Sequence, residues 1–388
     1  MPPSKPHGLS RRRLLGASAA TALLAACSGR ADGNGGVTTA DLEGRQAMDM
    51  QPLGLAGLLL PGQPEPVGIT LSGRRIAEIG ESVADGVATL DLGGSYAIPG
   101  MIDSHVHMQF ASSQSVLAGG VTTVRDLGGA PDAAQAMRGQ SPLRILIAGR
   151  ILTAVSGYPT RSWGADGTGR EVRDPDDALA AVDEQLSAGA VVLKVALEEA
   201  GGAPVLDVDT LRAIVRRGSE ANLQTTAHVG SAAMLDRAIE AGVRELCHLP
   251  LHDVTPAEMA RAAEAGMVLV PTLEIRGDDP AAIAALGAFR EAGGQVLYGT
   301  DLGNTGTAPG IEVREVRAML AAGMSPAEVL RSATSDPALY MALDTGRLEA
   351  GKVADIVILG ADPFEDPTAY DDVRLVVAGG EIVFDGTT

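Results

Sequence analysis

The chain has 388 residues, of which 45% are hydrophobic and 3% aromatic, so it can bury one large core and is too apolar for an intrinsically disordered protein. A formal net charge of -19, with no basic stretch beyond Arg11–Arg13, argues against a nucleic-acid partner. The two cysteines, Cys27 and Cys247, are too few for a disulfide framework.

The N-terminal residues have the pattern of an export signal. Ser10 and Arg11–Arg13 precede an apolar run over residues 14–26, which is too short to cross a bilayer as a helix. The arginines resemble a twin-arginine signal, and the stretch that ends at Cys27 resembles a bacterial lipobox. We therefore predict that residues 1–26 are removed on export and that a lipid on Cys27 anchors the protein to the outer side of the cell membrane. An ordinary secretory peptide is the alternative, which would leave the protein periplasmic or secreted.

Short β-type runs broken by Gly and Pro follow a Gly- and Asp-rich tether, residues 27–50, and recur at the far end of the chain. We predict that residues 51–98 and 349–388 pair into one small β-sandwich that flanks the middle of the chain. The runs lie at residues 53–60, 67–71, 74–79, 88–92, 353–359, 373–378 and 381–384.

The middle of the chain, residues 99–348, alternates helices with apolar strands. The segments Thr255 to Glu258 and Ser325 to Glu328 have the pattern of capping boxes with Pro at the first helical position. Strands alternating with helices predict a parallel sheet, and eight such units predict an α/β fold of the (β/α)8 TIM-barrel type with its active site at the carboxyl ends of the strands. The predicted strands are residues 101–107, 121–126, 144–150, 191–195, 224–229, 245–249, 267–273 and 296–301.

Side chains that bind metals gather at these strand ends. Because alternate residues of a strand point the same way, His105 and His107 can bind one ion from one strand end. A single His at a strand end is more often a hydrogen-bonded core residue, but so many ligand-type residues at separate strand ends favour a metal centre. The candidates are His105, His107, Lys194, His228, His248 and Asp301.

Lys194 is unusual because it interrupts an apolar strand, and lysine is seldom buried without a partner or a function. A neutral buried amine can add carbon dioxide and become a carbamate, whose two oxygens can bridge two cations. The alternative is an ordinary ion pair with Glu198 or Glu199.

The stretch Pro99 to His107 resembles the opening motif of the amidohydrolase superfamily, and residues 120–126, 226–229, 298–301 and 348–357 continue the resemblance. The chain looks closest to imidazolonepropionase-like and prolidase-like members. The resemblance implies two divalent metal ions, expected to be zinc, with a carboxylated lysine that needs carbon dioxide. It assigns His105, His107 and Asp301 to one ion, His228 and His248 to the other, and Lys194 to the bridge.

The same resemblance implies hydrolysis of an amide-type carbonyl by a metal-bridging hydroxide, with Asp301 as the acid and base that transfers the proton. The loop over residues 153–170 is expected to lie near the metals, with Trp163 over them and Tyr158 donating a hydrogen bond to the carbonyl or oxyanion. Arg161 or Arg276 is a candidate for pairing with a substrate carboxylate. Each of these residues has an alternative as an ordinary loop side chain, and His252 is expected beside the centre or on the surface.

Three functions follow from this interpretation. The first is a peptidase-like hydrolase of dipeptides or N-acyl amino acids, and the second is a cyclic amidohydrolase or a hydrolase of lactones or aryl amides, which needs no arginine. The third is a lipoprotein that binds metal without catalysis. A small-molecule substrate and a homo-oligomer are expected, with no nucleic acid and no membrane contact except the lipid anchor.

Overall fold

The computed structural model describes residues 50–129, 131–252, 254–277 and 279–387. The predicted export signal, Cys27 and nearly all of the predicted tether lie outside these residues. Within the described part of the chain, no helix combines the length and the apolar character that a membrane crossing requires.

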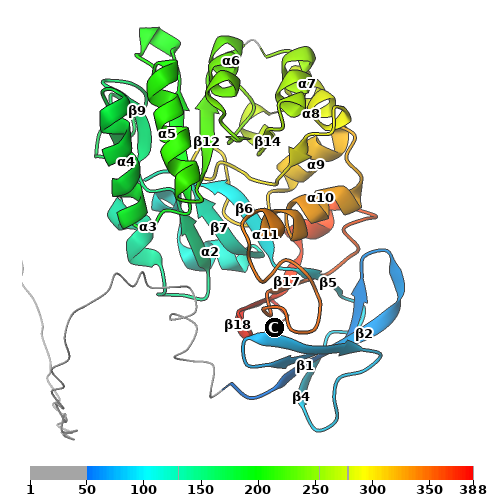
Figure 1. The fold of residues 1–388 in the computed structure, drawn as a ribbon. Helices are drawn as coiled ribbons and strands as arrows, with labels where there is room; N and C mark the ends of the chain where they lie inside the picture. Colours follow the sequence, from blue (N-terminus) through cyan, green and yellow to red (C-terminus); the bar gives the residue numbers. More distant parts are fainter. Residues whose placement is uncertain (1–49, 130, 253, 278, 388) are drawn as a thin grey trace, which may run out of the picture. The chain divides into compact units, whose positions relative to one another are not determined.

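The two ends of the chain meet in one eight-stranded sheet, which Figure 1 draws in blue and red. The link between the ends is the antiparallel pairing of β5 with β16, and β5 is a short strand that the sequence analysis did not predict. Apolar side chains from both ends, among them Leu55, Ile69 and Ile356, share a separate core. The strands are β1(Leu53–Leu60), β2(Gln63–Ser72), β3(Arg75–Gly80), β4(Ala88–Asp91), β5(Tyr96–Pro99), β16(Ile356–Leu359), β17(Val373–Ala378) and β18(Glu381–Asp385).

The middle of the chain contains a parallel strand at each of the eight predicted places, in a three-stranded and a seven-stranded sheet. The last three are shorter than predicted, with two residues each. The eight strands are β6(Met101–Val106), β7(Val121–Asp126), β8(Arg144–Ile147), β11(Val192–Leu197), β12(Gln224–Val229), β13(Glu245–Leu246), β14(Val268–Leu269) and β15(Gln295–Val296).

Helices separate most of these strands, and Figure 1 shows α4 to α8 on the outer side of β9, β12 and β14. Both predicted capping boxes are confirmed, because Thr255 and Ser325 accept from the backbone of Glu258 and Glu328, whose side chains accept in return. The helices are α2(Ser113–Ala118), α3(Pro131–Met137), α4(Pro175–Ser187), α5(Val208–Glu220), α6(Ala232–Ala241), α7(Pro256–Glu264), α8(Pro280–Glu291), α9(Val313–Ala321), α10(Pro326–Ser332) and α11(Ser335–Tyr340), with 3-10 turns η1(Met108–Phe110), η2(Ala200–Gly202), η3(Leu273–Arg276) and η4(Pro367–Asp371).

The prediction of a loop over residues 153–170 is partly wrong, because both ends of this segment lie in strands. β9(Ile151–Ala154) continues the third predicted strand after a short break, and β10(Gly169–Val172) pairs with it. β8 pairs with β7, whereas β9 pairs with β11, so this one segment links the two sheets. Residues 155–168 remain as the loop.

The segment that follows β15 lies beside β6. The amide of Ser104 donates to the carbonyl of Tyr298 at 3.0 Å, and the amide of Asp301 donates to the carbonyl of His105 at 2.8 Å. These bonds bring Asp301 to the strand end that carries His105 and His107, although almost two hundred residues separate them in sequence.

A buried ion pair that the sequence analysis did not predict joins β7 to β13. Arg125 is 2% exposed and Glu245 is fully buried. The guanidinium donates to both carboxylate oxygens, at 2.6 and 3.0 Å, and its Nε donates to the carbonyl of Ser104 at 2.9 Å. The pair therefore fixes two strands and the backbone beside His105.

We expect Arg125→Met to lower the free energy of unfolding by about 3–5 kcal/mol, because it leaves the carboxylate of Glu245 buried without its partner. Urea unfolding of the variant measures the effect. The control is Arg347→Met, which breaks the exposed pair with Glu349 and should cost no more than about 1 kcal/mol. Equal losses in the two variants would contradict the role given to the buried pair.

Candidate metal centre

His105, His107 and Asp301 form a buried three-residue cluster at the carboxyl end of β6. The Nε2 atoms of both imidazoles lie 3.2 Å from Oδ1 of Asp301. Nδ1 of His105 lies 2.6 Å from the carbonyl oxygen of Cys247, and Nδ1 of His107 lies 2.8 Å from that of Gly128. A carbonyl only accepts hydrogen bonds, so each neutral imidazole carries its proton on Nδ1 and directs the lone pair of Nε2 toward Asp301.

This cluster fits a divalent cation. Nε2 of His105 and Oδ1 of Asp301 are buried and have no hydrogen-bond partner among the described residues. Burial lowers the pKa of His105 well below its usual range, which keeps the imidazole in the neutral form that binds metals. One ligand atom from each of the three residues lies within 4.8 Å of the others. A cation would satisfy lone pairs that are otherwise buried at a cost.

His228 and His248 form a second pair on the neighbouring strand ends, with Nδ1 of His228 only 2.7 Å from Nε2 of His248. His248 donates its Nδ1 proton to the carbonyl of Leu249 at 2.7 Å, and Nε2 of His228 faces the carboxylate of Glu198 at 3.2 Å. The two nitrogens that face each other therefore both present lone pairs when the imidazoles are neutral. Burial lowers the pKa of His228 to about 3 and of His248 to about 4, so a shared proton is disfavoured. A second cation would satisfy both lone pairs.

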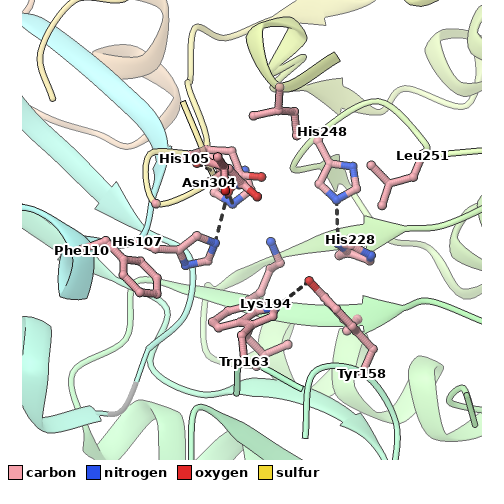
Figure 2. A pocket seen from close by; sticks show the side chains of 16 residues that line it. His105, His107, Phe110, Tyr158, Trp163, Lys194, His228, His248, Leu251 and Asn304 are labelled. Carbon is pink, nitrogen blue, oxygen red and sulfur yellow. Dashed lines mark hydrogen bonds and ion pairs between the residues drawn. The ribbon is translucent and has the colours of Figure 1, made fainter. Parts of the chain in front are cut away.

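Figure 2 shows the amine of Lys194 between the two histidine pairs. The side chain is buried, and Nζ lies 2.8 Å from Sγ of Cys247, a contact that the sequence analysis did not predict. The alternative ion pair with Glu198 or Glu199 is not formed between these described residues, because Glu198 faces His228 and Glu199 accepts from Ser231. Lys194 thus lies between the two groups of candidate ligands.

Glu198 belongs to the site as a partner of His228, a contact that was not predicted from the sequence. It lies directly after β11 and is buried, and the contact with the imidazole of His228 holds its pKa below its usual range. The carboxylate therefore fixes the His228 tautomer that presents Nδ1 to His248. The signal in the sequence that could have identified Glu198 was its position, one residue beyond the strand that carries Lys194.

We expect Glu198→Gln to weaken binding of the second metal ion by about ten- to a hundredfold, because the imidazole loses the charge that orients it. Competition with a chelating dye measures the affinity. Glu199→Gln is the matched control, because that exposed neighbour bonds only to Ser231. An unchanged metal affinity in Glu198→Gln would contradict this role.

The loop over residues 155–168 lies over both histidine pairs. The ring of Tyr158 stacks on His228 with centroids 4.8 Å apart, and the ring of Trp163 meets His107 edge-on at 5.3 Å. Nε1 of Trp163 donates to the hydroxyl oxygen of Tyr158 at 2.7 Å, so the tyrosine proton stays available to another acceptor (Figure 2). Both side chains take the positions expected from the sequence.

These residues surround one cavity of about 320 Å³, a size that suits a small molecule. All six predicted metal ligands line this cavity. The sequence could place these residues only at separate strand ends. The other lining residues are Phe110, Ile151, Tyr158, Trp163, Ala196, Leu251, Ile275, Gly303, Asn304 and Thr305.

Neither arginine proposed for a substrate carboxylate lines this cavity. Arg161 donates to the hydroxyl of Ser156, and Arg276 donates to the carbonyls of Pro250 and Leu251 and pairs with Asp279. His252 is exposed and does not line the cavity either. The sequence placed both arginines in nearby loops but contained no information on where their side chains point.

Parallel strands alternating with helices, with imidazoles and a carboxylate gathered at the strand ends, are typical of an α/β metal-binding enzyme. The chain belongs to the amidohydrolase family, whose model matches residues 96–383. It is a hydrolase that acts on carbon–nitrogen bonds.

The chain is also similar to individual proteins and to solved structures. An uncharacterized protein of Mycobacterium tuberculosis is 28% identical over 74% of this chain and 85% of its own length. Ochratoxinase of Aspergillus niger is 27% identical over 83% of each chain. The crystal structure of a Xaa-Pro dipeptidase superposes with a TM-score of 0.73 at 22% identity, covering 87% of this chain and all of that one, which shows a common fold.

Proposed function

We propose that this protein is a binuclear metal-dependent amidohydrolase. His105, His107 and Asp301 would hold one ion, His228 and His248 the other, and a carboxylated Lys194 would join them, with zinc as the expected metal. One observation carries the proposal. The facing nitrogens of His228 and His248 lie 2.7 Å apart, in the same cavity as Nε2 of His105 and Oδ1 of Asp301, which have no hydrogen-bond partner among the described residues. Two such ions would lower the pKa of a shared water and polarise the scissile carbonyl.

The residues of the chain supply the proton transfers. Asp301 lies 3.2 Å from both imidazoles of its cluster, where its second oxygen can take a proton from the attacking water and pass it to the leaving nitrogen. Tyr158, whose oxygen already accepts from Trp163, would donate its own proton to the carbonyl oxygen as negative charge develops there. The predicted leader supports the further proposal that this reaction takes place outside the cytoplasm.

Two substrate classes suit this chemistry. The Xaa-Pro dipeptidase is a structural neighbour whose name points to a dipeptide. Dipeptides and N-acyl amino acids carry a free carboxylate, whereas cyclic amides, aryl amides and lactones do not. A positively charged cavity wall would therefore favour the first class, and an uncharged wall would favour the second.

Metal removal tests the proposal. We expect the protein to bind two zinc ions per chain, to lose amide hydrolysis at least about a hundredfold after chelation, and to regain it on reconstitution. Elemental analysis and release of amine from a library of anilides, N-acyl amino acids and lactones provide the two measurements. Full activity without metal would overturn the proposal, whereas two bound ions without any hydrolysis would favour a metal-binding lipoprotein.

A further inference from the structure

The wall of the cavity above the metal cluster is apolar and uncharged. Phe110, Ile151 and Trp163 come from η1, β9 and the loop that follows β9, and Leu251 and Ile275 come from the segments after β13 and β14. Phe110 is 56% exposed and Trp163 is 37% exposed, so both present ring surface to whatever enters. The polar groups of the wall, Tyr158, Asn304 and Thr305, carry no charge.

Among the described lining residues, the charged side chains and the histidines are all predicted metal ligands. One candidate cation outside this set is Arg276, which adjoins Ile275 in the sequence. Its guanidinium turns away to two backbone carbonyls, at 2.9 and 3.1 Å, and to Asp279 at 3.3 Å. A carboxylate placed against this wall would lose its hydration and gain no partner.

We propose that the site selects uncharged amides whose acyl or leaving group is aromatic or branched aliphatic, and that it discriminates against substrates with a free carboxylate. This inference rests on the proposed hydrolytic function and assigns its substrate class. Burial of apolar surface against Phe110, Trp163 and Ile275 favours such a group, whereas desolvation of an unpaired anion opposes the other class. Offset or edge-on contact with the two exposed rings adds to the preference for an aryl group.

The test uses acetanilides that differ only in the para substituent of the ring, which is a carboxamide, a carboxylate or a trimethylammonium group. With the zinc-loaded protein, we expect kcat/KM for the neutral carboxamide to exceed that for the carboxylate at least about tenfold. Equal or faster hydrolysis of the carboxylate would overturn the inference and leave the proposed function intact. Preference for the trimethylammonium compound would also overturn it, in favour of a site that binds cations.

Thr305 offers a variant that supplies the missing charge without disturbing the core, because it lines the cavity and is exposed. We expect Thr305→Arg to narrow the preference for the neutral compound by about tenfold, because the guanidinium can pair with the carboxylate. Thr305→Gln, of similar length and without charge, is the control and should leave the ratio unchanged. A ratio that moves equally in both variants would overturn the charge argument.

Binding can be followed separately from turnover because Trp163 is the single tryptophan of the chain. If the two-metal protein hydrolyses neither these compounds nor any member of the library above, the proposed function fails, and quenching of Trp163 fluorescence by the same three compounds decides the charge preference alone. Direct binding of a carboxylate to the metals would bias this titration toward the anion. Tighter binding of the neutral compound would therefore support the inference, and tighter binding of the anion would overturn it.

Discussion

Replacement of Lys194 by alanine is expected to remove most of the bound metal and nearly all of the activity. The side chain lies between the two histidine pairs, and its carbamate would supply the negative charge and both oxygens that join the ions. Elemental analysis and turnover of the purified variant measure the two losses. Cys247→Ala is the matched control, because it removes the thiol 2.8 Å from the same amine and should leave metal and activity close to normal.

Chemical rescue separates the carbamate from an ordinary buried lysine. Formate or acetate at millimolar concentration should restore part of the activity of Lys194→Ala, because a small carboxylate supplies two oxygens in the vacated space. Bicarbonate should improve metal loading of the unmodified sequence, since carbon dioxide adds to the amine with loss of one proton. Intact mass under gentle ionisation should show the added carbon dioxide. A fully active, two-metal protein with an unmodified Lys194 would refute this role and require another bridging ligand.

Asp301→Asn is expected to lower the turnover number at least about a hundredfold, the usual effect of losing a general base. Burial opposes ionisation of Asp301, but the imidazoles of His105 and His107, when they carry a second proton, outweigh it and hold its pKa well below the usual range. The carboxylate is therefore available as a base at neutral pH. Asparagine keeps the size and one ligand oxygen but cannot accept the proton.

Metal content distinguishes this loss from a simple failure to bind. The ion assigned to His228 and His248 should stay bound in Asp301→Asn, because neither imidazole contacts Asp301 through a hydrogen bond. A near-normal turnover number in a variant that retains both ions would rule out Asp301 as the proton carrier.

Local patterns were enough to predict most of the strands and to select candidate metal ligands. His105 lies in β6 and His107 follows its last residue, and alternation of extended backbone puts both side chains on one side. The capping boxes at Thr255 and Ser325 were predictable for the same reason, because the residues that form them are three apart. Each of these features depends on neighbours in sequence.

Contacts between distant segments could not be predicted in this way. Arg125 and Glu245 meet across 120 residues, and the sequence contains no local sign of that ion pair. β9 was missed because its four residues follow a break in the strand, and only pairing with β10 and β11 shows that the strand resumes.

The sequence by itself determined the places of the parallel strands, the candidate metal ligands and the family of the chain, because these depend on spacing along one segment. Only the tertiary structure decided which nitrogen of each histidine faces the cavity, because the carbonyls of Cys247 and Gly128 and the carboxylate of Glu198 come from other strand ends. It also turned Arg276 away from the cavity, since two backbone carbonyls and Asp279 hold the guanidinium. Orientation of a long side chain depends on its partners in space, and spacing along the chain carries no record of them.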